Sequence, residues 1–268
     1  MKFPFAFSNY KESNLVIQSF FVNQSEENIL NNLRKISNKV EPIDIKNKRN
    51  YFEKLKIYDA GNFKIKYYDE IYEKTLENLK NGKFTLNIFI PHLFSLYSIG
   101  ICSENDGILI FDAHADLKDT FEKEKYHRAT WLRRLLELID EDKVMIIGLR
   151  SLDEDELNFI EENKISYLTS FEIEENLRKS LRKIKNFTQK FEKIYISFDV
   201  DVLDYSYVDS FYPESFGLNM FQIYEILDNI NSKIAGIDFC EFNIIDENKA
   251  INTVNLLFKL ISLFKNNI

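Results

Sequence analysis

The stretch Gly107-Ile-Leu-Ile-Phe-Asp-Ala-His-Ala-Asp116 decides the fold of this 268-residue chain. A short apolar run, Ile108–Phe111, is followed at once by acidic and imidazole side chains. Such a run is typical of a buried strand. Residues at positions i, i+2 and i+4 of an extended chain point to one face. Asp112, His114 and Asp116 are therefore predicted to converge just beyond the carboxyl end of this strand.

A second stretch, Ile194-Tyr-Ile-Ser-Phe-Asp-Val-Asp201, repeats the arrangement with Asp199 and Asp201 after another apolar run. In open α/β sheets, ligands bind outside the carboxyl ends of the strands. Two such strands side by side would bring four carboxylates and one imidazole into one pocket. Carboxylates that share a pocket resist joint ionisation, and divalent cations relieve that repulsion. The two stretches therefore predict a metal centre.

The chain contains only three histidines, His92, His114 and His127, and each lies near one of these features. His92 closely follows the apolar run Thr85–Ile90, and His127 lies beyond the loop that leaves Asp116. With the four carboxylates, His92 and His114 could hold two metal ions at a net charge near zero. Oxygen ligands with some imidazole suit Mn(II) or Mg(II) better than zinc. The alternative of solvated loop charges is disfavoured, because both motifs end apolar runs and buried carboxylates are rare.

The rest of the chain alternates predicted strands with predicted helices. The predicted strands are Leu15–Phe21, Lys54–Asp59, Thr85–Ile90, Ile108–Phe111, Val144–Leu149, Ile194–Phe198 and Ile234–Phe239. The predicted helices are Asn28–Ile36, Tyr68–Asn81, Ala129–Ile139, Glu154–Glu162, Met220–Ile230 and Ala250–Phe264, with a surface helix inside Glu172–Lys193. This alternation predicts an α/β fold, a three-layer α/β/α sandwich with a mostly parallel sheet. Residues 1–268 are expected to form a single domain.

Composition excludes several other classes of protein. The net charge of −8 provides no basic surface for nucleic acid, so no nucleic-acid partner is expected. No apolar stretch approaches the length of a membrane span, and Met1–Ser8 is too short for a secretory signal. The two cysteines, Cys102 and Cys240, lie in apolar contexts and are predicted to be buried free thiols. A cytoplasmic location is therefore expected.

At its motifs the chain resembles the ureohydrolases, the family of arginase, agmatinase and formimidoylglutamase. The family's D-A-H-x-D motif is matched by Asp112–Asp116, and its D-x-x-E-x-N motif by Asp238–Asn243. Its S-x-D-x-D-x-x-D-P motif is matched by Ser197–Asp204, with Tyr205 where proline is expected. Ile147–Ser151 matches I-G-x-R-S, and Asp59–Asn62 approximates D-x-G-D. The resemblance implies an arginase-like sandwich with a binuclear manganese centre, that is, two Mn(II) ions per chain.

The resemblance also implies roles for individual residues. It implies six metal ligands: His92, Asp112, His114, Asp116, Asp199 and Asp201. It further implies that Glu241 holds the substrate guanidinium, since a planar guanidinium pairs well with a carboxylate. His127 resembles the histidine that carries a proton to the departing amine. An agmatinase-like alignment without gaps puts that histidine at Arg128 instead, and both registers remain open.

Two segments depart from the family pattern. The family's G-G-D-H-S reads Phe89-Ile-Pro-His-Leu93 here, and Pro91 is predicted to send this turn along a different path because proline fixes φ. The loop on the substrate side reads Asp209-Ser-Phe-Tyr-Pro-Glu214. Phe211 and Tyr212 replace small residues in that loop and are predicted to narrow the mouth of the pocket.

The favoured function is hydrolysis of a small guanidino substrate, preferably agmatine, to urea and an amine. By resemblance, arginases read the α-carboxylate and α-amino group of arginine with Asn and Ser residues, which Leu117–Tyr126 lacks. Asp119, Glu122 and Glu214 would attract the amine of agmatine, whereas the neighbouring lysines and Arg128 would favour a carboxylate. The alternatives are an arginase, a formimidoylglutamase-type amidino hydrolase, or a diverged metal-binding relative without catalysis. The resemblance implies a homo-oligomer, either a trimer or a hexamer.

Overall fold

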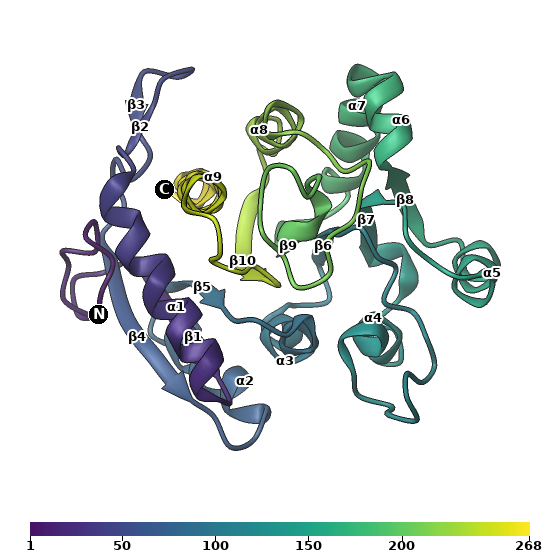
Figure 1. The fold of residues 1–268 in the computed structure, drawn as a ribbon, viewed down its shortest axis with the longest axis horizontal. Helices are drawn as coiled ribbons and strands as arrows, with labels where there is room; N and C mark the ends of the chain where they lie inside the picture. Colours follow the sequence, from purple (N-terminus) through teal and green to yellow (C-terminus); the bar gives the residue numbers. More distant parts are fainter.

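The computed structural model describes all 268 residues and is built around one eight-stranded sheet (Figure 1). The strand order is β4-β1-β5-β10-β9-β6-β7-β8, and every neighbouring pair is parallel. The strands are β1 (Leu15–Phe21), β4 (Ile57–Lys64), β5 (Phe84–Ile88), β6 (Asp106–Phe111), β7 (Val144–Leu149), β8 (Ser166–Thr169), β9 (Lys193–Asp199) and β10 (Lys233–Cys240). A small antiparallel hairpin, β2 (Ile43–Asp44) with β3 (Arg49–Asn50), lies outside the sheet.

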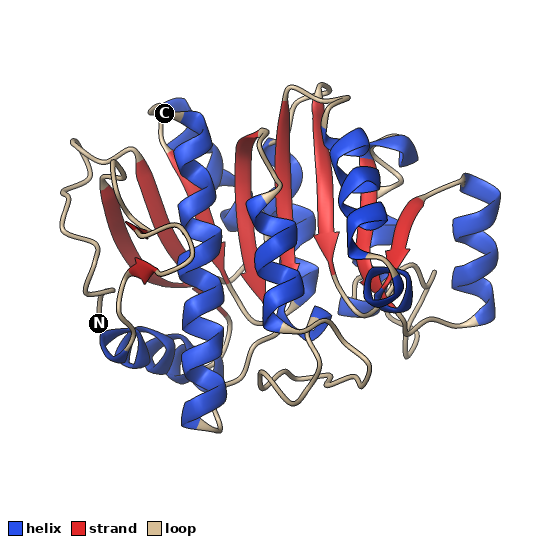
Figure 2. Cartoon of the chain, turned by 90° about the horizontal axis from the view of Figure 1, so that it is seen from above, coloured by secondary structure: helices blue, strands red, loops and turns tan.

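Helices cover both faces of the sheet, which confirms the predicted three-layer α/β/α sandwich. The helices are α1 (Gln24–Ile36), α2 (Asp69–Lys80), α3 (Ser95–Ser98), α4 (Trp131–Leu135), α5 (Glu154–Asn163), α6 (Ser170–Glu175), α7 (Leu177–Thr188), α8 (Met220–Asp228) and α9 (Glu247–Ser262). One hydrophobic core lies under α1, α6, α7, α8 and α9, and a second lies under α2, α3, α4 and α5. Figures 1 and 2 show these helices packed along the sheet.

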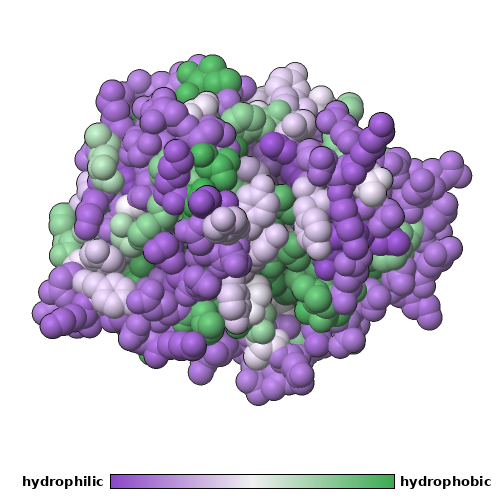
Figure 3. Space-filling model, turned by 90° about the horizontal axis from the view of Figure 1, so that it is seen from below, coloured by the Kyte–Doolittle hydropathy of each residue, from purple (hydrophilic) through white to green (hydrophobic).

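The strand sequences explain why the sheet is covered on both sides. Every residue of β1, β6 and β7 is buried. Strands that are buried along their whole length are typical of parallel sheets between two helical layers. The outer surface is different: the face in Figure 3 is mostly hydrophilic, and hydrophobic residues appear on it in small groups. None of the helices combines the length and the apolar composition that crossing a bilayer requires.

Most predicted elements are present, and the differences have local causes. The strand predicted at Lys54–Asp59 starts later and continues to Lys64, because β4 passes Gly61 through an irregularity in its pairing with β1. The helix predicted at Ala129–Ile139 is α4 alone, preceded by the 3₁₀ turn η4 (Arg128–Thr130). Leu138, which lies inside the predicted helix, is 76% exposed.

The charged region Glu172–Lys193, which follows β8, also differs from the prediction of one surface helix. It forms two helices, α6 and α7, that meet at Asn176, whose side chain accepts the Lys179 N–H and caps α7. The strand β8 has no counterpart among the predicted strands, because its four residues include only one fully buried side chain, Leu168. Such a short edge strand carries too little alternation to be recognised in the sequence.

The early D-x-G-D-like motif is a structural element in this chain. Arg34 on α1 donates from Nε and Nη2 to the two oxygens of Asp59 at 2.9 Å each, and both side chains are fully buried. Nη1 of Arg34 donates to Asn62 Oδ1 at 2.5 Å. A bidentate pair of this kind is strong and fixed in geometry. The motif therefore ties α1 to β4.

The four central strands position the functional residues. β5, β10, β9 and β6 are neighbours in the sheet although β10 comes last in the chain. Because all four are parallel, their carboxyl ends meet at one edge of the sheet. His92 follows β5, Asp112 follows β6, Asp199 ends β9, and Glu241 follows β10. The topology thus brings together residues that lie up to 149 positions apart in the sequence.

Candidate metal centre and active site

The first half of the centre surrounds His92, in the short 3₁₀ turn η2 (His92–Phe94) after β5. Its Nδ1 lies 3.0 Å from an oxygen of Asp112 and 3.2 Å from an oxygen of Asp199. A third carboxylate oxygen, from Asp116, lies 3.4 Å from the same nitrogen. The Pro91 turn, although different from the family pattern, therefore delivers His92 into the carboxylate cluster.

The second half surrounds His114 and shares one carboxylate with the first. His114 Nδ1 lies 3.0 Å from Asp201 Oδ2 and 3.5 Å from Asp112 Oδ1. Asp112 therefore faces His92 with one oxygen and His114 with the other. A carboxylate between two imidazoles can bridge two ions. All six predicted metal ligands thus come together in the structure, in three overlapping groups of possible ligands, one of which also contains Cys240.

The donor atoms fit a divalent metal. Nδ1 of His92 is buried and makes no hydrogen bond, although three carboxylates surround it. Its other nitrogen, Nε2, lies 3.0 Å from the Ser197 hydroxyl, which donates to Asp238 at 2.8 Å. Metal-binding histidines are commonly oriented in this way, with the second nitrogen held by a polar partner. Carboxylate and imidazole donors suit Mn(II) or Mg(II).

Three carboxylates of the cluster, those of Asp116, Asp199 and Asp201, resist ionisation in the metal-free protein. Burial raises the pKa of Asp199 well above its ordinary value, and the charges on Asp201 and Asp112 add to that rise. Burial and the charge on Asp112 raise the pKa of Asp116 to about 6. A divalent cation would remove this penalty, because it compensates the carboxylate charges that burial and mutual repulsion disfavour.

The stabilising effect of Mn(II) is therefore expected to depend on pH. Asp116 has a folded pKa of about 6, above its ordinary value, so the metal-free fold loses stability as pH rises through that range. Metal binding needs the ionised carboxylates. The Tm gain on adding Mn(II) should then be larger at about pH 7.5 than at about pH 5. Thermal unfolding at both pH values tests this prediction, with Asp142→Asn, at an exposed carboxylate, as the control. An equal Tm gain at both pH values would contradict the prediction.

Two residues of the site adopt strained backbone conformations. Asp116 has φ of 53° and Glu241 has φ of 56°, in the left-handed region that non-glycine residues rarely occupy. Each costs about 1–3 kcal/mol and persists only where the surroundings enforce it. The Trp131 indole donates to Asp116 Oδ2 at 2.7 Å, and the Glu241 N–H donates to the Ile90 carbonyl at 3.0 Å. Strain of this kind typically collects at functional sites.

The I-G-x-R-S motif fixes the loop that carries Asp201. Gly148 has φ of 97°, and a Cβ there would lie 2.5 Å from Val202 Cγ2. Arg150 reaches over this loop and donates to the backbone carbonyl of Asp201 at 2.6 Å. Its Nε donates to the carbonyl of Ser215 at 2.8 Å. The motif therefore holds the end of β9 against the neighbouring substrate-side loop.

A cavity of about 360 Å³ opens onto the cluster of possible metal ligands. Its lining includes His92, His114, Asp116, Lys118, Phe121, Glu122, His127, Arg128, Ala129, Asp199, Asp201, Tyr212 and Glu241. Of the two aromatic residues predicted to narrow its mouth, Tyr212 lines the cavity. Phe211 does not; its N–H donates to the Glu241 carbonyl at 3.0 Å.

Glu241 is bound by the protein on both of its oxygens. The His92 N–H donates to Oε1 at 2.9 Å. Nη1 of Arg128 donates to Oε2 at 2.9 Å and to Oε1 at 3.2 Å. Burial raises the pKa of Glu241 to about 7, and the Arg128 charge partly opposes that rise. The Arg128 guanidinium also lies over the Tyr212 ring, 4.6 Å from its centre.

His127 lies in the same cavity wall as Arg128 but makes different contacts. Its ring stacks on Phe121 at 4.6 Å between centres. Its Nδ1 accepts the Ala129 N–H at 3.2 Å and so caps the η4 turn. Burial lowers the pKa of His127, and the charge on Arg128 lowers it further. His127 and Arg128, the two positions left open for the proton-carrying histidine, therefore both line the cavity. Of the two, Arg128 contacts Glu241.

The acidic residues expected to attract an amine are not equivalent. Glu122 lines the cavity. Glu214 Oε1 lies 3.4 Å from His114 Nε2 and accepts the Ser151 hydroxyl at 3.0 Å. Asp119 instead pairs with Arg134 at 2.8 Å and does not line the cavity. Only two of the three expected carboxylates are therefore near the centre.

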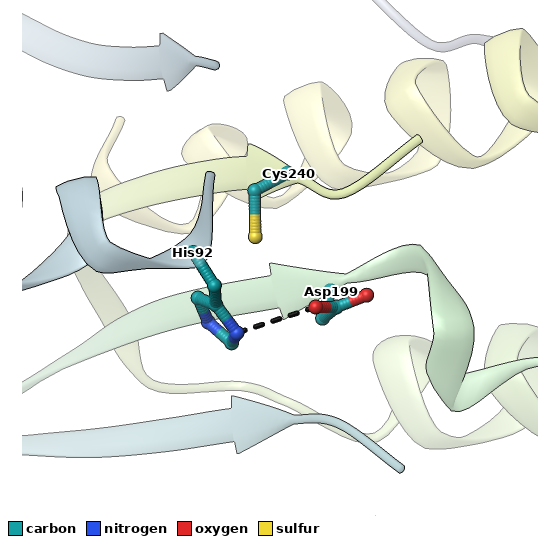
Figure 4. A group of neighbouring side chains, drawn as sticks. All are labelled: His92, Asp199 and Cys240. Carbon is teal, nitrogen blue, oxygen red and sulfur yellow. Dashed lines mark ion pairs between the residues drawn. The ribbon is translucent and has the colours of Figure 1, made fainter. Parts of the chain in front are cut away.

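Two residues near the centre were not expected there. Cys240, predicted to be a buried thiol, is buried, and its sulfur lies beside His92 and Asp199 (Figure 4). Its position directly before Glu241 was the only signal in the sequence. Trp131, predicted to pack in the core, is fully buried but also lies 4.6 Å from His92 between ring centres. The other thiol, Cys102, is free and only half-buried.

Comparison with known proteins gives consistent matches. A sequence profile of the arginase family matches residues 28–264. An agmatinase of Pyrococcus horikoshii is 28% identical over 224 residues, which cover 78% of this chain and 75% of that protein. An agmatinase of Bacillus subtilis is 30% identical over 159 residues, or 56% of this chain and 53% of that protein. The solved agmatine ureohydrolase of Thermoplasma volcanium has a similar fold, with a TM-score of 0.89 at 21% identity, covering 99% of this chain and 94% of that one.

Proposed function

The chain belongs to the arginase family of ureohydrolases, and from this premise we propose that it is a manganese-dependent hydrolase of a guanidino compound. Its products would be urea and an amine, with agmatine preferred over arginine as substrate. One observation carries the proposal: the overlapping groups of possible metal ligands open onto the cavity that Glu241 also lines. A metal centre and a guanidinium-binding carboxylate in one cavity are the two parts that such a reaction needs.

The proposed ligands are His92, Asp112, His114, Asp116, Asp199 and Asp201. Bound there, two Mn(II) ions would supply an activated water for attack on the guanidinium carbon. Ser197 would keep His92 in the tautomer whose Nδ1 is free to bind, since its hydroxyl contacts Nε2 at 3.0 Å. Trp131 would hold Asp116 in place through its indole N–H.

The remaining steps are assigned to residues of the cavity wall. Glu241 would hold the substrate guanidinium in one plane, because two parallel N–H···O bonds fix its orientation. His127 would donate the proton that the departing amine takes up, and burial keeps its pKa below the ordinary value. The stacking of His127 on Phe121 would fix the ring against the cavity wall.

The preference for agmatine rests on charge. Glu122 in the cavity and Glu214 beside His114 would attract the terminal amine of agmatine. The α-carboxylate of arginine would meet the same groups unfavourably. A second candidate, hydrolysis of an amidino acid such as a formimidoyl amino acid, is favoured by Arg128, since its guanidinium could instead pair with a substrate carboxylate. Lys118 also lines the cavity, but its ammonium group pairs with Asp153 and Glu156.

We expect agmatine to exceed arginine by at least about tenfold in kcat/KM, since a site built around one polar pattern rejects analogues that leave charged groups unpaired. Urea release from the manganese-loaded protein with agmatine, arginine and a formimidoyl amino acid measures this. A preference for arginine would make the protein an arginase. Consumption of the formimidoyl acid without urea release would make it the second candidate.

A further inference from the structure

We propose that Arg128 is an internal competitor for Glu241, and that it sets the affinity of the site for guanidino substrates. The inference rests on the proposed function of Glu241 as the guanidinium-binding carboxylate. It starts from the observation that a guanidinium from the protein itself already contacts both oxygens of that carboxylate, at 2.9 and 3.2 Å.

Both oxygens of Glu241 already accept hydrogen bonds from the protein. Oε1 accepts from the His92 N–H and from Arg128, and Oε2 accepts from Arg128. A substrate guanidinium would need the same two oxygens, because a carboxylate binds a guanidinium through paired N–H···O bonds. The two cations would also repel each other at this distance. Substrate and Arg128 therefore cannot occupy Glu241 together.

The competing contact is built into the site. Arg128 opens the η4 turn, and its guanidinium lies between Glu241 and the Tyr212 ring. The Glu241 side chain is 3% exposed, whereas the Arg128 side chain is 26% exposed. Arg128 thus enters the cavity from its open side. Its long side chain can leave toward solvent without any change in the backbone, while Glu241 stays in place.

This geometry has a consequence for binding. A substrate binds only to the fraction of molecules in which Arg128 has left Glu241, so the apparent affinity is reduced by that fraction. Once the substrate is bound, Arg128 no longer contacts Glu241, and the chemical step is unaffected by the competition. Removing the Arg128 side chain should therefore lower KM and leave kcat nearly unchanged.

The test compares wild type with Arg128→Ala, both loaded with manganese. With agmatine, KM should fall by at least about tenfold while kcat changes by less than about threefold. The inhibition constant of guanidinium chloride should fall in parallel, because this ion competes for the same carboxylate. Arg133→Ala is the matched control: its guanidinium lies 3.5 Å from the centre of the Phe159 ring and it does not line the cavity, so both constants should stay unchanged.

A rise in KM or a loss of kcat in Arg128→Ala, with manganese content and Tm unchanged, would overturn the inference and make Arg128 a substrate-binding or catalytic residue. Failure of the proposed function is distinguishable, because then neither protein releases urea from any guanidino compound. Calorimetric titration with guanidinium chloride still decides in that case. Tighter binding to Arg128→Ala supports the competitor, and equal binding overturns it.

Discussion

Replacing Asp199 with Asn should lower the manganese content of the purified protein from about two ions per chain to one or fewer. Asn has the shape of Asp but not its charge, and the carboxylate of Asp199 lies 3.2 Å from the unpaired Nδ1 of His92. Without that charge, the ion near His92 loses an anionic ligand in a buried site. Metal analysis after reconstitution with Mn(II) and dialysis measures the change.

Asp204→Asn is the matched control for this prediction. Asp204 follows the same strand, but its oxygens accept from Ser206 and the Gly217 N–H, away from the cluster. Its replacement should leave the metal content at the wild-type value. Equal manganese in Asp199→Asn and wild type would remove Asp199 from the proposed ligands.

The second large effect is expected at Glu241. Glu241→Gln should reduce urea formation by at least about a hundredfold, because the amide cannot accept two bonds from a cationic guanidinium and one of its groups is itself a donor. Metal content should stay at the wild-type level, since the contacts of Glu241 are to the His92 N–H and Arg128 and not to the cluster nitrogens.

Both measurements on Glu241→Gln are needed. Loss of activity with full metal content assigns Glu241 to the substrate. Parallel loss of metal would instead make Glu241 part of the metal centre, and unchanged activity would remove it from the reaction. Glu122→Gln provides the control in the same cavity, because it removes a carboxylate at the rim without touching Glu241 and should affect KM for agmatine more than kcat.

The sequence was sufficient for the fold and for the residues of the cluster because both depend on short-range patterns. Apolar runs that end in D-x-H-x-D and D-x-D mark strands whose side chains must alternate. Parallel strands then bring these ends together, and Asp112 and Asp201 meet His114 as predicted. His92 lies in the cluster although Pro91 precedes it, because the η2 turn begins directly after Pro91, beyond the end of β5.

The contacts inside the cavity could not be predicted from the sequence, because they depend on the directions in which side chains point. The sequence His127-Arg128 does not show which of the two side chains turns toward Glu241. In the structure the His127 side chain caps the η4 turn, and the Arg128 side chain contacts Glu241. Asp119 and Glu122 are equally acidic, yet a pairing with Arg134 removes one of them from the cavity. Likewise, Asp59 matched a family motif but forms a buried ion pair with Arg34.

Trp131 gives the chain an internal optical reporter. It is the only tryptophan, and its indole binds a proposed metal ligand, Asp116, while its ring lies beside another, His92. Tyrosine absorbs only at shorter wavelengths, so long-wavelength excitation isolates the emission of this single side chain. A paramagnetic ion in the cluster would quench that emission at close range, whereas diamagnetic Mg(II) would not. Filling and emptying of the centre can therefore be followed by fluorescence in the unlabelled protein.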